Sequence, residues 1–309
     1  MRRLLPLLLS ACGLPYVAPS PFTQPTAPQT PIEVCWLETG GLEVGGGFGA
    51  AGRVHADTWH ATTSALLVKH PKGDVLIDSG LSATPEEDAR ELSSWGRFVF
   101  GQTAGRNLPR GALPKLLALA GSSAVSGIVL SHAHADHAGG LGLVPNAPVW
   151  VAREELDFAA REGNDAVLPA HARQVQARGQ AIPFTDQGYA GYPRSWDVFQ
   201  DGTLVVVPTF GHTPGSVATF VNLGARRLVH VGDLVNLQES VEREAPKSWV
   251  MSALTDEDRA ATEREVARLV RLQRQDPGLW ILPAHDRAAY EAFFGALPVE
   301  SHEPRCVTR

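Results

Sequence analysis

From Glu33 onward the chain alternates short apolar runs with amphipathic stretches. Apolar and β-branched runs that end in Gly, Pro, Asp or Lys turns predict β-strands. Pro71-Lys72-Gly73-Asp74 forms such a turn between the first two runs, and Pro208 ends a later one. The predicted strands cover residues 64–69, 75–77, 127–130, 204–207, 217–221, 228–231 and 279–282.

The amphipathic segments between these strands predict helices. In Thr84-Pro85-Glu86-Glu87 a capping residue precedes a proline at the first helical position, so a helix should begin there. Further helices are predicted over residues 114–120 and 152–161, and a long charged one from a Thr255 cap to about Gln275. Strands in runs, interrupted by helices, indicate the α/β class and an αββα sandwich. Residues 163–200 lack clear periodicity and are expected to form a lid or an insertion.

The first residues have the order of an export signal. Arg2 and Arg3 precede an apolar run over residues 4–9 and the small residues Ser10 and Ala11. That run is too short to span a bilayer as a helix. Leu9 to Cys12 resembles the lipobox of bacterial lipoproteins, which implies lipid attachment at Cys12, the expected membrane contact; an ordinary cleaved signal is the alternative.

Residues 13–32 contain six prolines and no charged residue, a composition typical of a semi-rigid spacer. The predicted organisation is therefore an export signal over 1–11, the lipid-attachment Cys12 with a proline-rich linker over 12–32, and one catalytic domain over 33–309. Exported chains meet an oxidising compartment, where Cys35 and Cys306 either form a disulfide or stay unpaired. The sequence leaves both possibilities open.

Composition narrows the expected partners. The chain has 309 residues, 44% of them hydrophobic and 19% charged, with a net charge of −6. Nucleic-acid binding needs a clustered basic surface, so this balance favours a small-molecule substrate instead. The three cysteines form no CxxC pair, which argues against a thiolate metal site.

The strongest chemical signal is the segment Ser131–Gly140, with the sequence SHAHADHAGG. It follows a predicted buried strand, where side chains project from a rigid edge. His132 and His134 stand at i and i+2 and should point the same way, and Asp136 and His137 follow as the chain turns. Imidazole and carboxylate groups suit Zn²⁺ and similar ions.

Three more candidate ligands stand at or just after predicted strand ends. His212 lies in the segment GHTPG, Asp233 follows Val231-Gly232, and His285 lies in the segment PAHD. An isolated histidine or aspartate is more often structural. Here the same local setting recurs three times, each with a glycine or proline close by, which indicates one shared site.

This motif set resembles the metallo-β-lactamase superfamily over roughly residues 33 to 295. The resemblance implies two divalent metal ions, zinc being the expected element. One ion would be held by His132, His134 and His212, the other by Asp136, His137 and His285, with Asp233 between them. It also implies catalytic roles for Asp233 and Asp136, and identifies Asp78 in LIDSG with the family carboxylate that orients a ligand loop.

This chain differs from several branches of the superfamily, which narrows the set of branches that it resembles. Dizinc β-lactamases would carry a cysteine at position 233, and flavodiiron proteins a glutamate at position 134. Glyoxalase II enzymes append a helical region, whereas only 24 residues follow His285. The pattern is most similar to N-acyl homoserine lactonases and secreted organophosphate hydrolases, and the segment Phe100–Leu117 also resembles that branch.

The expected reaction is attack of metal-activated water on a lactone or ester carbonyl, with Asp233 positioning the nucleophile. Phosphotriester hydrolysis is the alternative; a β-lactamase or an iron-dependent sulfur dioxygenase on the same fold is less favoured. Lactonases often carry a tyrosine three residues after the bridging aspartate, where this chain has Asn236. Tyr189 or Tyr192 would then replace it from the expected lid.

The sequence alone does not assign a role to several other residues. Trp196 and Phe199 either line an acyl pocket or pack in the core. The remaining histidines match no motif and are expected to be structural or at the surface: 55, 60, 70, 171, 230 and 302.

Overall fold

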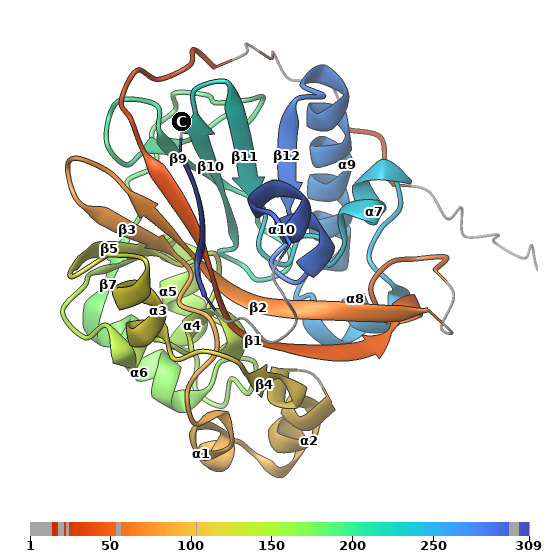
Figure 1. Cartoon of the computed structure of the whole chain (residues 1–309). Helices are drawn as coiled ribbons and strands as arrows, with labels where there is room; N and C mark the ends of the chain where they lie inside the picture. The colour runs from red at the N-terminus through yellow and green to blue at the C-terminus, as the bar shows by residue number, and fades with distance from the viewer. Residues whose placement is uncertain are drawn as a thin grey trace, which may run out of the picture.

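The computed structural model describes residues 14–17, 22, 25–53, 57–102, 104–296 and 303–308. Two β-sheets pack face to face, and helices cover the outer face of each sheet (Figure 1). This is the αββα sandwich that the sequence predicts, so the fold class is confirmed. The expected export signal and Cys12, together with His55 and His302, lie outside the described residues.

The first sheet combines antiparallel and parallel pairing. Its strands, in spatial order, are β13 (Arg305–Thr308), β1 (Glu33–Gly45), β2 (Thr58–Lys69), β3 (Asp74–Ile77), β5 (Val125–Val129), β6 (Val149–Val151) and β7 (Gly179–Ala181), and β4 (Leu108–Pro109) also pairs with β1. The pairs β3–β5, β5–β6 and β6–β7 are parallel. The carboxyl ends of these strands therefore meet at one edge, and the HxHxDH segment begins there.

The second sheet has the spatial order β12 (Leu279–Leu282), β11 (Arg226–His230), β10 (Val217–Leu223), β9 (Leu204–Pro208) and β8 (Trp196–Asp197). Strands β11 and β12 are parallel, with His230 opposite Leu282. Asp233 lies three residues after His230, and His285 lies three residues after Leu282. The parallel register therefore brings both side chains to the same edge of the second sheet.

Ten α-helices and four short 3₁₀ helices connect the strands within the described ranges. The α-helices are α1 (Pro85–Asp88), α2 (Ser94–Gln102), α3 (Leu113–Leu119), α4 (Ala135–Ala138), α5 (Arg153–Ala159), α6 (Pro169–Arg178), α7 (Gln238–Glu242), α8 (Trp249–Thr255), α9 (Arg259–Gln275) and α10 (Arg287–Phe294). The 3₁₀ helices are η1 (Gly46–Phe48), η2 (Ala89–Glu91), η3 (Ala104–Arg106) and η4 (Leu141–Leu143). Among the helices of the described residues, none has the length and apolarity needed to cross a membrane.

Alternation along the strands explains the layers. Val34 and Trp36 of β1 belong to the cluster between the sheets, whereas Cys35 and Leu37 belong to the cluster under helices α3, α5 and α6. Successive strand residues point to opposite faces, and both faces are covered, so the strands are apolar almost throughout. Fully burying a side chain such as Leu37 stabilises the fold by roughly 1.5–3 kcal/mol.

Helix α9 covers the other face of the second sheet, but it begins later than predicted. Thr255 is the last residue of α8, and its hydroxyl donates to the carbonyl of Met251. The cap of α9 is Asp258, whose carboxylate accepts from the backbone N–H of Ala261. The Thr255 hydroxyl is used within α8 and does not cap α9, whereas aspartate is a favoured N-cap residue.

Two other expectations need correction. Helix α1 begins after Thr84 as predicted, but the Thr84 side chain makes no capping hydrogen bond. Residues 163–200, which lack clear periodicity and are expected to form a lid or an insertion, contain α6, β7 and β8, and the two strands lie at the edges of the two sheets. Helix α6 buries only His171 and Val175, so its sequence carries little apolar periodicity.

A disulfide joins Cys35 and Cys306, which face each other across the β1–β13 ladder. It closes a sequence separation of 271 residues. The sequence analysis predicts neither of these strands. Strand β1 contains Gly40 and Gly41 and a buried Glu38, none of which is typical of a strand interior, and its register shifts between Glu38 and Gly40.

Candidate metal centre

The chain leaves β5 at Val129 and enters the SHAHADH segment at the edge of the first sheet. His132 and His137 are almost fully buried, and α4 begins at Ala135. The glycines that follow α4 allow a close approach of two backbones. A Cβ at Gly139 would lie 2.2 Å from the backbone nitrogen of Ser82, so glycine is required there.

The three histidines of the first predicted set face one another. His132 Nε2 lies 3.1 Å from His134 Nδ1, and His212 Nε2 lies 3.2 Å and 3.1 Å from these two atoms. In tetrahedral zinc coordination, two ligand nitrogens about 2.0–2.1 Å from the ion lie about 3.3–3.4 Å apart. The observed triangle has nearly this size, so the i, i+2 expectation for His132 and His134 is confirmed as geometry.

The second predicted set lies beside the first. His285 Nε2 is 3.5 Å from Asp136 Oδ2, and His137 Nε2 is 3.9 Å from Asp136 Oδ1. Asp233 lies between the sets: its Oδ1 is 3.2 Å from His137 Nε2 and 3.1 Å from His285 Nε2, and its Oδ2 is 3.6 Å from His212 Nε2. The fold therefore brings all seven predicted side chains together.

The donor set fits a pair of cations. The seven side chains fall into overlapping groups whose ligand atoms lie within 4.8 Å of one another: His132, His134 and His212; His132, His137 and Asp233; and Asp136, His137 and His285. His137 Nε2 and Asp233 Oδ1 are buried, yet neither makes a hydrogen bond among the described residues. Buried polar atoms normally have partners, so these two atoms are suited to act as ligands of an ion.

The protonation tendencies differ between the two sets. Burial, with the positive charge of neighbouring imidazoles, holds the pKa of His132 and of His134 well below the usual range. Burial also lowers the pKa of His285, but the Asp233 carboxylate outweighs it and raises that pKa to about 9. Burial favours a higher pKa for Asp233, yet His285 and His137 hold it well below its usual value. The pKa of His212 is lowered too, mainly by burial, so the first set favours neutral imidazole, the form that binds metal.

Asp78 has the contacts expected of an orienting carboxylate. Its Oδ2 lies 2.7 Å from His137 Nδ1, and its Oδ1 and Oδ2 accept from the backbone N–H and the hydroxyl of Ser131 at 2.6 Å and 2.8 Å. Burial raises the pKa of Asp78, but His137 outweighs it and lowers the pKa overall. The hydrogen bond to His137 Nδ1 leaves Nε2 directed at the cluster.

Three other residues beside the ligands are missed by the sequence analysis. Asp256 Oδ1 lies 2.8 Å from His212 Nδ1 and contacts the buried ammonium of Lys247, which also donates to the backbone carbonyl of Asp233 at 2.8 Å. Glu155 on α5 is fully buried. Burial raises the pKa of Glu155 to about 7, although hydrogen bonds to its carboxylate oppose the shift. No motif or spacing in the sequence marks these three positions.

His285 has its own supports. Its Nδ1 lies 2.8 Å from the backbone carbonyl of Thr62, and its backbone carbonyl accepts from the Trp59 indole at 3.2 Å. Both partners belong to β2. The first sheet therefore orients a candidate ligand that follows a strand of the second sheet.

The expected substrate residues do not all lie at this centre. Tyr189 packs edge-on against Phe220 and accepts a hydrogen bond from Asn222, and Tyr192 is buried in the cluster under α9. Both pack on the second sheet, so their expected placement in a lid over the ligands is wrong. Asn236 is buried, and its Nδ2 finds no hydrogen-bond partner among the described residues.

The open aromatic and histidine positions are core or surface residues. Trp196 and Phe199 pack with the cluster between the sheets, and Phe199 stacks on His70, whose Nε2 lies 2.9 Å from Asp201. His171 and His230 are also buried outside the ligand set, and His60 pairs with Glu43 at the surface. Among the described histidines, the structural or surface interpretation is confirmed.

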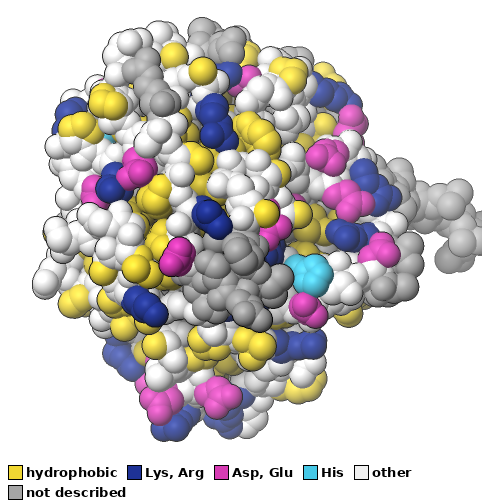
Figure 2. Space-filling model, in the orientation of Figure 1, with side chains coloured by type: hydrophobic (Ala, Val, Ile, Leu, Met, Phe, Trp, Pro, Cys, Tyr) yellow, Lys and Arg dark blue, Asp and Glu magenta, His cyan; other side chains and the backbone are white. Residues whose placement is uncertain are grey.

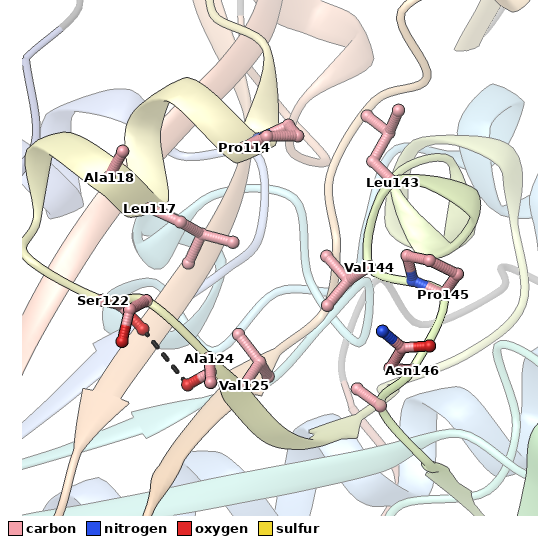
Figure 3. A pocket seen from close by; sticks show the side chains of 12 residues that line it. Pro114, Leu117, Ala118, Ser122, Ala124, Val125, Leu143, Val144, Pro145 and Asn146 are labelled. Carbon is pink, nitrogen blue, oxygen red and sulfur yellow. Dashed lines mark hydrogen bonds between the residues drawn. The ribbon is translucent and has the colours of Figure 1, made fainter.

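A separate pocket lies at the other end of β5. It has a volume of about 440 Å³ and lies between α3 and the segment that follows η4; Leu117, Val125 and Val144 are among its lining residues (Figure 3). Val125 begins β5, whereas the ligand segment follows the end of that strand. The pocket is therefore not part of the candidate metal centre.

Comparisons with known proteins identify a family and several similar proteins. A family model described as the metallo-beta-lactamase superfamily matches residues 58–285. The N-acyl homoserine lactonase AttM of Agrobacterium fabrum is 27% identical over 230 residues, which cover 74% of this chain and 83% of that protein. "Probable metallo-hydrolase Rv2300c" of Mycobacterium tuberculosis is 28% identical over 284 residues, covering 86% and 84%.

A solved structure shares the fold. The structure of AidC, described as a dizinc quorum-quenching lactonase in complex with a product, matches with a TM-score of 0.56 and 20% identity. The match covers 86% of this chain and 90% of that one.

Proposed function

This chain belongs to the metallo-beta-lactamase superfamily and is a metal-dependent hydrolase, and we propose that it uses two divalent ions to open a lactone or cleave an ester. The observation that carries the proposal is the position of Asp233. Its carboxylate lies between the His132–His134–His212 set and the Asp136–His137–His285 set, within 3.6 Å of a histidine of each. A carboxylate in that place suits a bridge between two cations.

His132, His134 and His212 would hold one ion, and Asp136, His137 and His285 the other. Zinc is proposed because imidazole nitrogen and carboxylate oxygen suit it, and because AidC is described as dizinc. Such ions, when bound, would lower the pKa of a water molecule and polarise a carbonyl oxygen.

The chain's own residues supply orientation and proton handling. We assign to Asp233 and Asp136 the positioning of the attacking water, because both carboxylates adjoin His285 Nε2 at 3.1 Å and 3.5 Å. Asn236, three residues after Asp233, offers a buried amide nitrogen without a partner among the described residues. We assign it to a substrate oxygen, in place of the tyrosine that lactonases often carry.

The surroundings favour a substrate with an apolar part. Ala135, within the ligand segment, packs with Ala89 and Leu92. Trp59, which bonds the backbone of His285, packs with Leu237. On the face drawn in Figure 2, basic and acidic side chains are interspersed, as suits a small substrate better than a polyanion.

A substrate panel on one metal-analysed sample tests the proposal. The full chain is analysed for metal as purified. It is then assayed, as purified and after loading with Zn²⁺, with N-acyl homoserine lactones of short and long acyl chain, a simple γ-lactone, an aryl ester, a phosphotriester and a β-lactam. We expect lactone or ester turnover that a chelator abolishes and Zn²⁺ restores, with about two metal ions per chain.

The other outcomes of the panel contradict the proposal in different ways. Phosphotriester turnover without lactone or ester turnover would support the alternative hydrolase. One iron per chain with no hydrolysis of any substrate would support a sulfur dioxygenase. Turnover of β-lactams alone would support a β-lactamase, a class disfavoured by Asp233 in place of the expected cysteine.

We also propose export, with a signal over residues 1–11, lipid attachment at Cys12, a linker to residue 32 and the catalytic domain from Glu33 to the end. The Cys35–Cys306 disulfide supports this, because such bonds persist in oxidising compartments. In a bacterial host the wild-type chain should fractionate with membranes and Cys12→Ala should not. Equal membrane association of the two would contradict lipid anchoring.

A further inference from the structure

Glu155 connects the two segments that carry the first histidine set. It stands on α5, outside all the motifs, and its side chain is fully buried. Oε1 accepts from the backbone N–H of Ala133 at 2.7 Å. Oε2 accepts from the hydroxyl of Thr213 at 2.7 Å and from the backbone N–H of Gly215 at 3.1 Å.

The three donors have a specific place in the chain. Ala133 is the residue between His132 and His134, and Thr213 directly follows His212. Ala133 follows β5 of the first sheet, whereas Thr213 lies between β9 and β10 of the second. One carboxylate therefore ties the ligand segments of both sheets, at the point where their histidine nitrogens lie 3.1–3.2 Å apart.

The GHTPG segment lies so close to Glu155 that only glycine fits at position 215. A Cβ there would lie 2.2 Å from the backbone nitrogen of Glu155 and 2.6 Å from its Cβ. The glycine of GHTPG thus lets the segment reach the carboxylate. A buried carboxylate is costly unless it is fully hydrogen-bonded, so an apolar residue would fill this position more cheaply if only packing mattered.

The second set is held by other contacts. Asp78 bonds His137, and the backbone carbonyl of Thr62 bonds His285. Glu155 touches none of these side chains in the contacts found among the described residues. Its influence should therefore fall on one of the two candidate ion positions.

We propose that Glu155 is a positioning residue that sets the distance between the His132–His134 pair and His212, and so the affinity of that one metal position. This inference rests on the metal centre of the proposed function. The carboxylate acts as a fixed double acceptor that holds two segments in register, and it takes no part in proton transfer to the substrate.

Glu155→Gln tests the inference because an amide has one acceptor oxygen and one donor nitrogen. The nitrogen must then face the N–H of Ala133 or of Gly215, donor against donor. The matched control is Asp157→Asn, the same change of carboxylate to amide at an exposed position of the same helix. Both are made in the full chain.

The readout is Co²⁺ binding, followed by chelator competition and by the visible spectrum. In the wild type and in Asp157→Asn we expect two equivalents with the same affinities. In Glu155→Gln we expect one equivalent to bind 10- to 100-fold more weakly with an altered spectrum, and the other to be unchanged. Thr213→Val, which removes one donor, should weaken the same equivalent less, and Thr213→Ser should restore it. The two Thr213 variants test the inference if Glu155→Gln does not fold.

Results that contradict the inference can be distinguished from results that contradict the proposed function. Wild-type affinities in Glu155→Gln would overturn the inference and leave the proposed function standing. Equal weakening of both equivalents, together with a lower melting temperature, would show a general structural role and also overturn it. A wild-type chain that binds no divalent ion would overturn the metal centre, and the inference with it.

Discussion

His137 Nε2 lies 3.2 Å from Asp233 Oδ1, and this contact joins the edges of the two sheets. His137 follows β5 of the first sheet, and Asp233 follows β11 of the second. Both atoms are buried, and neither makes a hydrogen bond among the described residues. The two sheets thus present a buried nitrogen and a buried carboxylate oxygen that face each other, an arrangement that a cation beside them would stabilise.

Asp233→Ala removes the carboxylate that adjoins both sets. We expect the metal content to fall from about two ions per chain to at most one. Hydrolysis should slow by roughly 100-fold or more, as when one electrostatic stabiliser is removed from a hydrolase site. Metal analysis and substrate turnover check this, with Asp186→Asn, an exposed acid, as the control. Two bound ions and an unchanged rate in Asp233→Ala would be incompatible with a bridging role.

Lys247→Met leaves the Asp256 carboxylate buried without its cation. Both side chains are almost fully buried, and breaking such a pair costs roughly 3–5 kcal/mol of the free energy of unfolding. The double variant Lys247→Met/Asp256→Asn removes both charges and should regain part of this loss. Urea denaturation of Lys247→Met, Asp256→Asn, the double variant and the wild type measures the coupling. Additive losses in the double variant would mean that the two groups do not interact.

His230 makes the fold sensitive to acid. Burial lowers its pKa to about 4, although Asp78 opposes the shift, whereas an unfolded histidine titrates near 6.5. Because the folded-state pKa is depressed, its contribution is complete above pH 6.5 and is lost as the pH falls toward about 4. We expect a loss of roughly 3 kcal/mol in the free energy of unfolding over that window.

Urea denaturation of the metal-free protein between pH 4 and 7.5 measures this dependence. His230→Gln should flatten the slope. Some slope should remain, because burial also lowers the pKa of His132 and His134. The same slope in the variant and the wild type would show that His230 is not the acid-sensitive group.

The Cys35–Cys306 disulfide holds β13 against β1. Cys306→Ser should lower the free energy of unfolding by about 2–4 kcal/mol, the typical effect of a native disulfide. A reducing agent should shift the wild-type denaturation curve by a similar amount and leave the variant unchanged. Metal content should not change, because β13 carries none of the candidate ligands. A variant as stable as the wild type would show that β13 docks without the bond.

Much of the centre follows from local pattern alone. The i, i+2 spacing of His132 and His134 after a buried strand suffices to predict that their nitrogens face the same way. The glycines that follow the ligand segment allow a close backbone approach, which the structure shows between Gly139 and Ser82. The αββα layers also follow from strands that are apolar on both faces. These properties depend on neighbours within a few residues, which the sequence shows directly.

Other features depend on which segments the tertiary structure brings together. Tyr189 and Tyr192 pack on the second sheet, and the weak periodicity of residues 163–200 gives no sign of this placement. Glu155 and Lys247 have no motif around them, and their roles appear only once distant segments meet. Whether Cys35 meets Cys306 depends on a ladder between strands 271 residues apart in sequence. Local sequence sets how each strand ends, whereas long-range register and sheet packing decide which ends face each other.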